Sequence, residues 1–134
     1  MPFVQVHVSR GHDAAQSAAI ANAVHEALVA VVDIPSADRF QVVTRHADGE
    51  MVWDRGYLGV ARSDRAVFVH VTLAAGRSDD KKRALYAAIA AGVARDAGVR
   101  PEDVLIVLTE VGRIDWSFGN GIAQYVPGPA PATG

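Results

Sequence analysis

The second residue of the chain, Pro2, is the first candidate for chemistry. A small residue at this position is compatible with removal of Met1, which would leave Pro2 with a secondary amine at the chain end. An α-amine has a reference pKa of about 7.7 to 8.0, so burial or a nearby charge can make it a base, an acid or an iminium-forming nucleophile. Proline at position two is also common and can simply stabilise a terminus. We favour catalysis because Pro2 starts a predicted strand, which would hold the amine in place.

Charged and aromatic side chains elsewhere could complete such a site, but each has an ordinary alternative. Asp38 ends a Pro-Ser-Ala-Asp turn, where an aspartate commonly accepts hydrogen bonds from local amides. Arg77 precedes a predicted helix, where an arginine is usually solvated. Trp116 and Phe118 share one side of an extended segment, either as core residues or as a wall that excludes water. The residues alone leave these alternatives open.

The five histidines do not form a metal-binding pattern. No pair has the HxH, HExxH or HxxxH spacing, and no acidic residue completes a cluster. We therefore predict no metal and no cofactor. His7 and His70 occupy corresponding places in two similar segments, where we expect hydrogen-bonded histidines in a subunit interface.

The composition predicts one small domain and excludes several functions. The chain has 134 residues, half of them hydrophobic, which is enough for one core. Its 13 basic and 15 acidic residues give a net charge of -2 without a basic stripe, so we predict no nucleic-acid partner. The absence of cysteine excludes thiol chemistry and favours a cytoplasmic protein. The sequence has no signal-peptide pattern and no apolar run of about 18 residues, so we predict no membrane association.

The first half of the chain reads as strand, helix and strand. Residues 3–8 alternate between apolar and polar side chains, which predicts a strand. Asp13 can cap a helix that runs to Val31, in which apolar residues recur every three or four positions. Residues 40–44 are rich in aromatic and β-branched side chains and predict a second strand, and residues 51–53 predict a brief edge strand.

The second half repeats this order. Residues 67–72 resemble the opening strand, and Ser78 can cap a helix that reaches Ala97. Residues 104–109 predict a further strand. The Gly-Asn-Gly run at residues 119–121 predicts a turn between two short edge strands.

The spacing of matching residues indicates an internal duplication. His7 and His70 are 63 residues apart, and Asp38 and Asp103 are 65 residues apart. A near-constant offset across a whole β-α-β unit predicts two such units side by side. We therefore predict an α+β fold in which tandem β-α-β units form one four-stranded mixed sheet, with two helices on one face.

The predicted domain spans residues 1–126, with pseudo-repeats at residues 1–62 and 63–126. The face of the sheet opposite the helices carries many apolar side chains, and so small a domain needs another subunit to cover them. We therefore expect a closed homo-oligomer. Residues 127–134 are rich in proline, glycine and alanine and predict a flexible tail.

Four runs of residues are informative when taken together. They are Pro2-Phe3, Asp38-Arg39-Phe40-Gln41-Val42-Val43, Gly76-Arg77-Ser78 and, most specifically, Asp115-Trp116-Ser117-Phe118-Gly119. These runs resemble the tautomerase superfamily, and within it most of all the malonate semialdehyde decarboxylases. The resemblance covers nearly the whole chain. It implies a β-α-β-β-α-β subunit that assembles as a homotrimer, with three active sites that each surround one N-terminal proline.

The resemblance also implies roles for the candidate residues. Asp38 matches an aspartate that orients or activates water or adjusts the charge of Pro2, and Arg77 matches an arginine that binds the substrate carboxylate. Trp116 and Phe118 match an aromatic wall that removes water from the proline pocket. The implied substrate is a small carbonyl or unsaturated acid that carries a carboxylate.

The sequence departs from this pattern at one position. Related decarboxylases tend to have Arg-Pro-Arg where this chain has Ala75-Gly76-Arg77, so the first arginine is missing. Arg55, Arg62 and Arg65 are candidates to supply the missing positive charge.

Three functions agree with this pattern. The leading one is decarboxylation or hydration of a small oxo acid, in which Pro2 polarises the carbonyl or forms an iminium with it. The second is promiscuous keto-enol tautomerisation of the phenylpyruvate type, with Pro2 as a proton shuttle. The third is a catalytically silent oligomeric binding module of the same fold.

Overall fold

The structure, a computed structural model, describes residues 1–129. Its strands and helices are β1 (Pro2–Val8), α1 (Ala14–Val32), β2 (Phe40–Arg45), β3 (Val67–Ala74), α2 (Asp79–Ala97) and β4 (Val104–Val111). Three single 3-10 turns are η1 (Tyr57–Gly59), η2 (Pro101–Asp103) and η3 (Arg113–Asp115). These bounds agree with the predicted elements to within two residues at each end.

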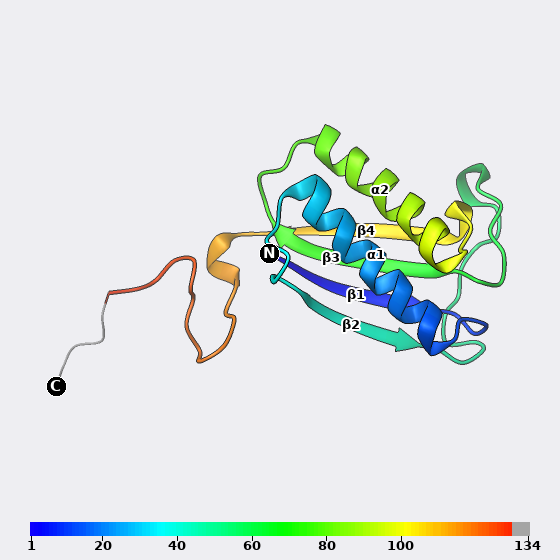
Figure 1. Ribbon diagram of the computed structural model, residues 1–134, viewed down its shortest axis with the longest axis horizontal. Coiled ribbons are helices and arrows are strands. Elements are labelled where there is room, and N and C mark those ends of the chain that lie inside the picture. Colours follow the sequence, from blue (N-terminus) through cyan, green and yellow to red (C-terminus); the bar gives the residue numbers. More distant parts are fainter. Residues whose placement is uncertain (130–134) are drawn as a thin grey trace.

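The four strands form one mixed sheet in the order β2-β1-β3-β4, with both helices on one face (Figure 1). β1 and β3 are antiparallel at the centre, and each pairs in parallel with the second strand of its own half. Gln5 pairs with His70 and His7 pairs with Phe68, so the two halves are related by a rotation about the Val6 and Val69 pair. The predicted fold of tandem β-α-β units is therefore confirmed.

Both helices begin at the capping residues that the sequence predicts, and each ends at a residue in the left-handed region. The Asp13 carboxylate accepts a hydrogen bond from the Gln16 amide at 2.8 Å, and Asp33 ends α1 in the left-handed region at φ 58°. The Ser78 hydroxyl accepts from the Lys81 amide at 3.2 Å, and Gly98 ends α2 at φ 66°. The φ of Gly98 is one that a residue with a Cβ rarely adopts, which explains a glycine there.

The core lies between the helices and the covered face of the sheet. Alternate residues of β1 and β3 are fully buried, as are the apolar stripes of both helices. The largest of these buried side chains are Ile20, Leu28, Leu73, Leu85 and Ile89. α1 is long and apolar enough to cross a membrane by composition alone, but half of it is buried, as in a core helix of a globular domain.

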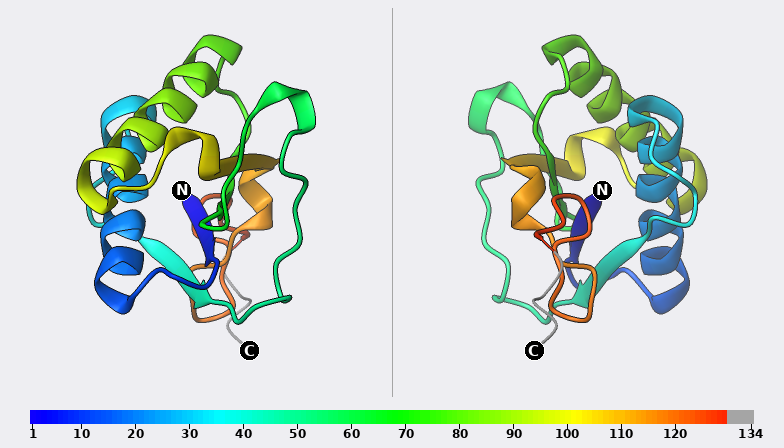
Figure 2. Two further views of the ribbon diagram at one scale, coloured as in Figure 1. Left: turned by 90° about the vertical axis from the view of Figure 1, so that its right-hand side faces the viewer. Right: turned by 90° about the vertical axis from the view of Figure 1, so that its left-hand side faces the viewer.

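Residues 46–65 form a long loop on the open side of the sheet, opposite the helices (Figure 2). The prediction of an edge strand at residues 51–53 is wrong, because this segment pairs with no strand. It is held by a side chain instead: the Trp53 indole donates to the Ser63 carbonyl at 3.1 Å and packs edge-on against Phe68. Trp53 therefore holds this loop in place through its side-chain contacts and does not extend the sheet.

The segment after β4 also differs from the prediction. Residues 119–121 form the expected turn, with positive φ at all three residues, but no strand lies on either side of it. Residues 127–129 form neither helix nor strand, and the rest of the predicted tail lies outside the described residues.

Candidate active site

Four strand ends meet at one end of the sheet, where the chain begins (Figure 1). β1 and β2 start there and β3 and β4 end there, because the central pair is antiparallel. Pro2 pairs with Leu73, and Phe3 pairs with Phe40. The topology therefore gathers Pro2, the turn before β2 and the segments that follow β3 and β4. These regions hold the five residues to which the sequence assigns catalysis or substrate binding, Pro2, Asp38, Arg77, Trp116 and Phe118.

Asp38 forms an ion pair with the start of the chain. Its Oδ2 lies 3.2 Å from the Met1 amine, and the two side chains are only 13% and 10% exposed. The carboxylate is fixed by a tight turn in which the Asp38 amide donates to the Pro35 carbonyl at 3.0 Å. Because water is largely excluded, this pair interacts more strongly than an exposed one. The geometry thus holds a positive charge at the chain end beside one carboxylate.

Aromatic rings form a wall next to this pair. Trp116 and Phe118 are stacked, with ring centroids 5.7 Å apart and planes 6° apart. Phe40 lies 5.6 Å from Phe118, and Tyr125 meets Phe118 edge-on at 5.2 Å. A cavity of about 320 Å³ is lined by Phe3, Phe40, Trp116, Ser117 and Phe118. Trp116 and Phe118 therefore lie on the same wall, together with Tyr125, which the sequence pattern does not indicate.

A glutamine holds this wall together. The Gln124 side chain accepts from the Phe118 amide at 2.9 Å and donates to the Gly119 carbonyl at 3.0 Å. These two bonds close the turn at residues 119–121 and bring Tyr125 back onto Phe118. The Gly-Asn-Gly run predicts the turn. Nothing in the local sequence indicates that the turn brings the Tyr125 ring onto Phe118.

Tyr125 and Trp116 carry the polar groups of the wall. Burial raises the pKa of the Tyr125 phenol, and the nearby Asp38 carboxylate raises it further, while Arg113 lowers it. The Trp116 indole N–H is buried and has no hydrogen-bond partner within residues 1–129. A buried donor without a partner is costly, so a ligand oxygen that accepts this hydrogen bond would be favoured there.

Arg77 lies at the same end of the sheet, three residues after β3. Its Nη1 donates to the Ala74 carbonyl at 2.7 Å, and the side chain is half-buried. Within the described residues it forms no ion pair with a carboxylate. The planar guanidinium therefore keeps donors free for an anionic ligand.

The three arginines proposed to supply a further charge lie at the opposite end of β1. Arg65 donates to the Gly11 carbonyl at 2.9 Å, beyond the end of that strand. Arg62 donates to three carbonyl groups of its own loop, and Arg55 pairs with Asp64. Within one subunit, none of the three is near Pro2.

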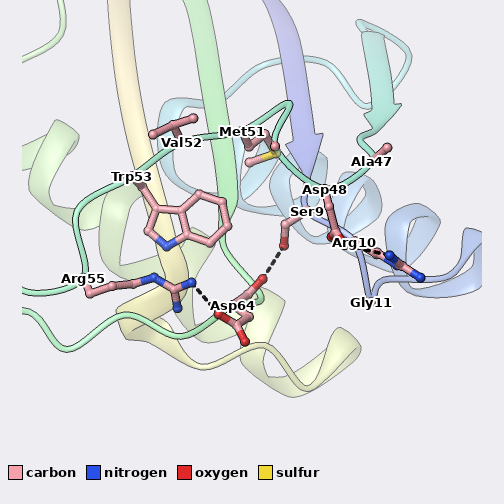
Figure 3. A pocket seen from close by; sticks show the side chains of 11 residues that line it. Ser9, Arg10, Gly11, Ala47, Asp48, Met51, Val52, Trp53, Arg55 and Asp64 are labelled. Carbon is pink, nitrogen blue, oxygen red and sulfur yellow. Dashed lines mark hydrogen bonds and ion pairs between the residues drawn. The ribbon is translucent and has the colours of Figure 1, made fainter.

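A second cavity of about 440 Å³ lies at that far end (Figure 3). Its charged groups are already paired with one another, Arg10 with Asp48 at 2.6 Å and Arg55 with Asp64. The Arg55 guanidinium also lies 5.1 Å from the Trp53 ring centroid. Because its charges are satisfied internally, this cavity is a weaker candidate for an anionic substrate than the end that holds Asp38 and Arg77.

Two histidines, His7 and His46, lie against each other on the open face of the sheet. His7 Nδ1 lies 2.8 Å from His46 Nε2, with the rings stacked at 5.0 Å. Burial lowers the pKa of His7, and the neighbouring His46 and His70 lower it further. No group of three metal-ligating side chains is found within residues 1–129. His70 bonds to the Thr109 hydroxyl at 2.7 Å.

Comparison with known proteins agrees with this geometry. Residues 38–119 match one family described as tautomerase enzyme, and residues 2–56 match a second family with the same description. The probable tautomerase YusQ of Bacillus subtilis (strain 168) is 37% identical over 94% of this chain and 99% of its own. The probable tautomerase YrdN of the same organism is 29% identical over 96% and 98%.

Solved structures give the same result. FG41 malonate semialdehyde decarboxylase, inhibited by 3-bromopropiolate, is 41% identical and superposes with a TM-score of 0.87 over 92% of this chain and 93% of its own. A malonate semialdehyde decarboxylase solved in wild-type, mutant and inactivated forms is 34% identical, with a TM-score of 0.85 over 92% and 95%. A fused 4-OT, solved as a symmetric trimer, is 28% identical with a TM-score of 0.73 over 90% and 94%.

Fold, sequence and site together define a small α+β enzyme of the tautomerase class. The chain belongs to the tautomerase superfamily, and the predicted similarity to malonate semialdehyde decarboxylases is confirmed.

Proposed function

We propose that this protein is an N-terminal-proline enzyme that decarboxylates or hydrates small oxo acids of the malonate semialdehyde type. The observation that carries the proposal is the Asp38 carboxylate, fixed 3.2 Å from the amine at the start of the chain and beside an aromatic cavity. The two similar decarboxylase structures support the substrate class, and one of them was solved to explain decarboxylase and hydratase activities.

Removal of Met1 is the first step of the proposed activation. The Met1 nitrogen is separated from the Pro2 nitrogen by only two backbone atoms, so the new amine forms close to Asp38. While Met1 is attached, the Pro2 nitrogen is a tertiary amide and has no basic lone pair. Once it is removed, Pro2 is a secondary amine at the end of a paired strand.

The mechanism then follows from the charges around this amine. Arg77 holds the substrate carboxylate. In one route protonated Pro2 polarises the carbonyl, and in the other neutral Pro2 attacks the carbonyl and releases water to form an iminium. The electron pair of the breaking carbon-carbon bond moves into the carbonyl or iminium, and carbon dioxide leaves. The resulting enol or enamine then takes a proton, and in the second route water hydrolyses the iminium to release the aldehyde. Asp38 keeps the amine charged or directs water for hydration. The wall of Trp116 and Phe118 limits competing water and strengthens each charge interaction.

Keto-enol tautomerisation is the second candidate function. It is favoured by the two Bacillus subtilis relatives, which are both named as probable tautomerases. The same amine, when neutral, can take a proton next to the carbonyl and return it to the oxygen. A silent binding module of the same fold predicts neither reaction.

We also propose a trimer as the active assembly. The open face of the sheet exposes apolar side chains, including Phe40, Val42, Leu105 and Val107, each 42% to 48% exposed. An apolar face of this kind is typical of a subunit interface. A fused 4-OT of 28% identity was solved as a symmetric trimer.

The labelling agent 3-bromopropiolate, which inhibits the FG41 decarboxylase, tests the proposal. We expect one adduct per chain, found on the N-terminal proline by peptide mass spectrometry, with loss of turnover of malonate semialdehyde and phenylpyruvate. Pro2→Ala should lose this turnover while keeping its sedimentation behaviour. An adduct on another residue, or an unlabelled and inactive wild-type protein, would contradict the proposal.

A further inference from the structure

Arg113 follows β4 directly and is fixed by its own turn. The Asp115 carboxylate accepts from the Gly112 amide at 2.7 Å, and the Asp115 amide donates to the Gly112 carbonyl at 3.1 Å. Asp115, the acidic residue nearest to Arg113 in the sequence, is thus hydrogen-bonded to the backbone of the turn. Arg113 forms no ion pair within residues 1–129, whereas Arg10 and Arg83 pair with nearby aspartates.

The Arg113 guanidinium lies over an aromatic ring of the wall. Its Cζ is 5.5 Å from the centroid of the Tyr125 ring, within the range of a cation-π contact. Tyr125 in turn packs edge-on against Phe118. Burial raises the pKa of the Tyr125 phenol and the Asp38 carboxylate raises it further, whereas the Arg113 guanidinium lowers it. Arg113 is therefore held against the Tyr125 ring of the aromatic wall.

The neighbouring strand places Arg113 beside the segment that holds Arg77. β3 and β4 are parallel, Ala74 pairs with Val111, and the Ala75 amide donates to the Val111 carbonyl at 2.9 Å. The chain leaves the sheet at the ends of these adjacent strands, after β3 toward Arg77 and after β4 toward Arg113. Ala75, between them, is small and exposed. Two guanidinium groups without carboxylate partners thus emerge from adjacent strand ends.

We propose that Arg113 is a substrate-binding residue that receives the carboxylate of the ligand together with Arg77, and that Tyr125 is the residue that positions it. This inference rests on the proposed site at the chain start. A guanidinium without a carboxylate partner can present two parallel donors to a carboxylate. The Tyr125 ring limits the freedom of the long side chain, which lowers the entropy lost on binding. The ligand class is a small monocarboxylate or dicarboxylate that carries a carbonyl group.

The test measures binding of malonate, a dicarboxylate without the reactive aldehyde, to the full chain. We expect the Arg113 Nε–Hε NMR signal to shift on titration, and Arg113→Gln to raise the dissociation constant about tenfold or more. Arg113→Lys should recover part of the loss, and Tyr125→Leu should weaken binding as Arg113→Gln does. Arg83→Gln, which alters an exposed arginine on α2, is the matched control and should bind as the wild type does.

Binding of malonate does not require the Pro2 amine to react, so this test is separate from that of the proposed function. A wild-type protein that binds malonate through Arg113 but turns over no oxo acid would contradict the proposed reaction alone. Absence of malonate binding, a static Arg113 signal, or equal affinity in Arg113→Gln would each overturn the role of Arg113. With an active enzyme, Arg113→Gln should raise KM for the acid.

Discussion

Asp38 and Asp103 occupy equivalent places in the two halves of the chain but bind different partners. Each ends a turn in which its amide donates to the carbonyl three residues earlier, to Pro35 at 3.0 Å and to Arg100 at 2.9 Å. The buried Asp103 carboxylate accepts from the amide and hydroxyl of Ser63 at 2.7 and 2.6 Å. The Asp38 carboxylate faces the charged start of the chain. One copy of the duplicated turn is therefore structural, and the other is available for chemistry.

The same substitution at these two positions should separate stability from activity. Asp103→Asn disrupts two charge-assisted hydrogen bonds in a buried site and should lower the free energy of unfolding by about 1.5 to 3 kcal/mol. Asp38→Asn should cost less stability but lower kcat/KM at least about tenfold, because it removes the charge beside the amine. Urea denaturation and steady-state kinetics of both variants measure this. If the two substitutions had equal effects on the free energy of unfolding and on kcat/KM, the structural role of Asp103 and the chemical role of Asp38 would be refuted.

Trp116→Phe should distinguish the ring of Trp116 from its N–H group. The variant keeps an aromatic surface against Phe118 but removes a buried donor that has no partner within residues 1–129. We expect unchanged or slightly higher stability and a decrease in kcat/KM of about tenfold, since a substrate oxygen loses its donor. Thermal unfolding and kinetics check this together. A stability loss with unchanged kinetics would indicate that the indole serves packing alone.

Tyr125 should ionise at higher pH than free tyrosine. Its pKa is raised first by burial and then by the negative charge of Asp38, whereas Arg113 opposes the shift. The ultraviolet titration difference between the wild type and Tyr125→Phe should therefore have its midpoint above about 10. Asp38→Asn should lower this midpoint, and Arg113→Gln should raise it. A midpoint that responds to neither change would place Tyr125 away from both charges.

Protonation of His7 should destabilise the fold at mildly acidic pH. The pKa of His7 is lowered, mainly by burial and then by His46 and His70, while Glu50 lies 3.6 Å from His46. The stability contribution of neutral His7 is present above the unfolded pKa of about 6.5 and is lost as pH falls through the lower pKa of the folded state. Between pH 7.5 and 5.5, an interval of about two pH units, the melting temperature should therefore fall less in His7→Gln than in the wild type. An identical decrease in both proteins would contradict this.

The sequence predicts the regular elements of this fold well because their signals are local. Alternation in residues 3–8 and the caps Asp13, Ser78 and Gly98 each report on the backbone within a few residues. The error at residues 51–53 has a different cause. Trp53 is fixed by Ser63 and Phe68, which are distant in sequence, so its apolar neighbours resemble a strand but pair with none.

In the candidate site, too, the contacts that could not be predicted join residues that are distant in sequence. Trp116 and Phe118 could be placed on one wall because they are two residues apart in an extended segment. Tyr125 and Arg113 were not predicted, because their contact depends on a turn that returns the chain after β4. Gln124 is the residue that makes this turn specific, and a lone glutamine carries no signal of such a role.

A free and reactive amine on Pro2 can be detected by one paired measurement. The chain is prepared with Met1 retained and is then treated with a methionine aminopeptidase, while intact mass and turnover of malonate semialdehyde are followed together. We expect turnover to be absent at first and to rise in proportion to the fraction of chains that have lost Met1. Full turnover by chains that retain Met1, or no turnover after its complete removal, would contradict it.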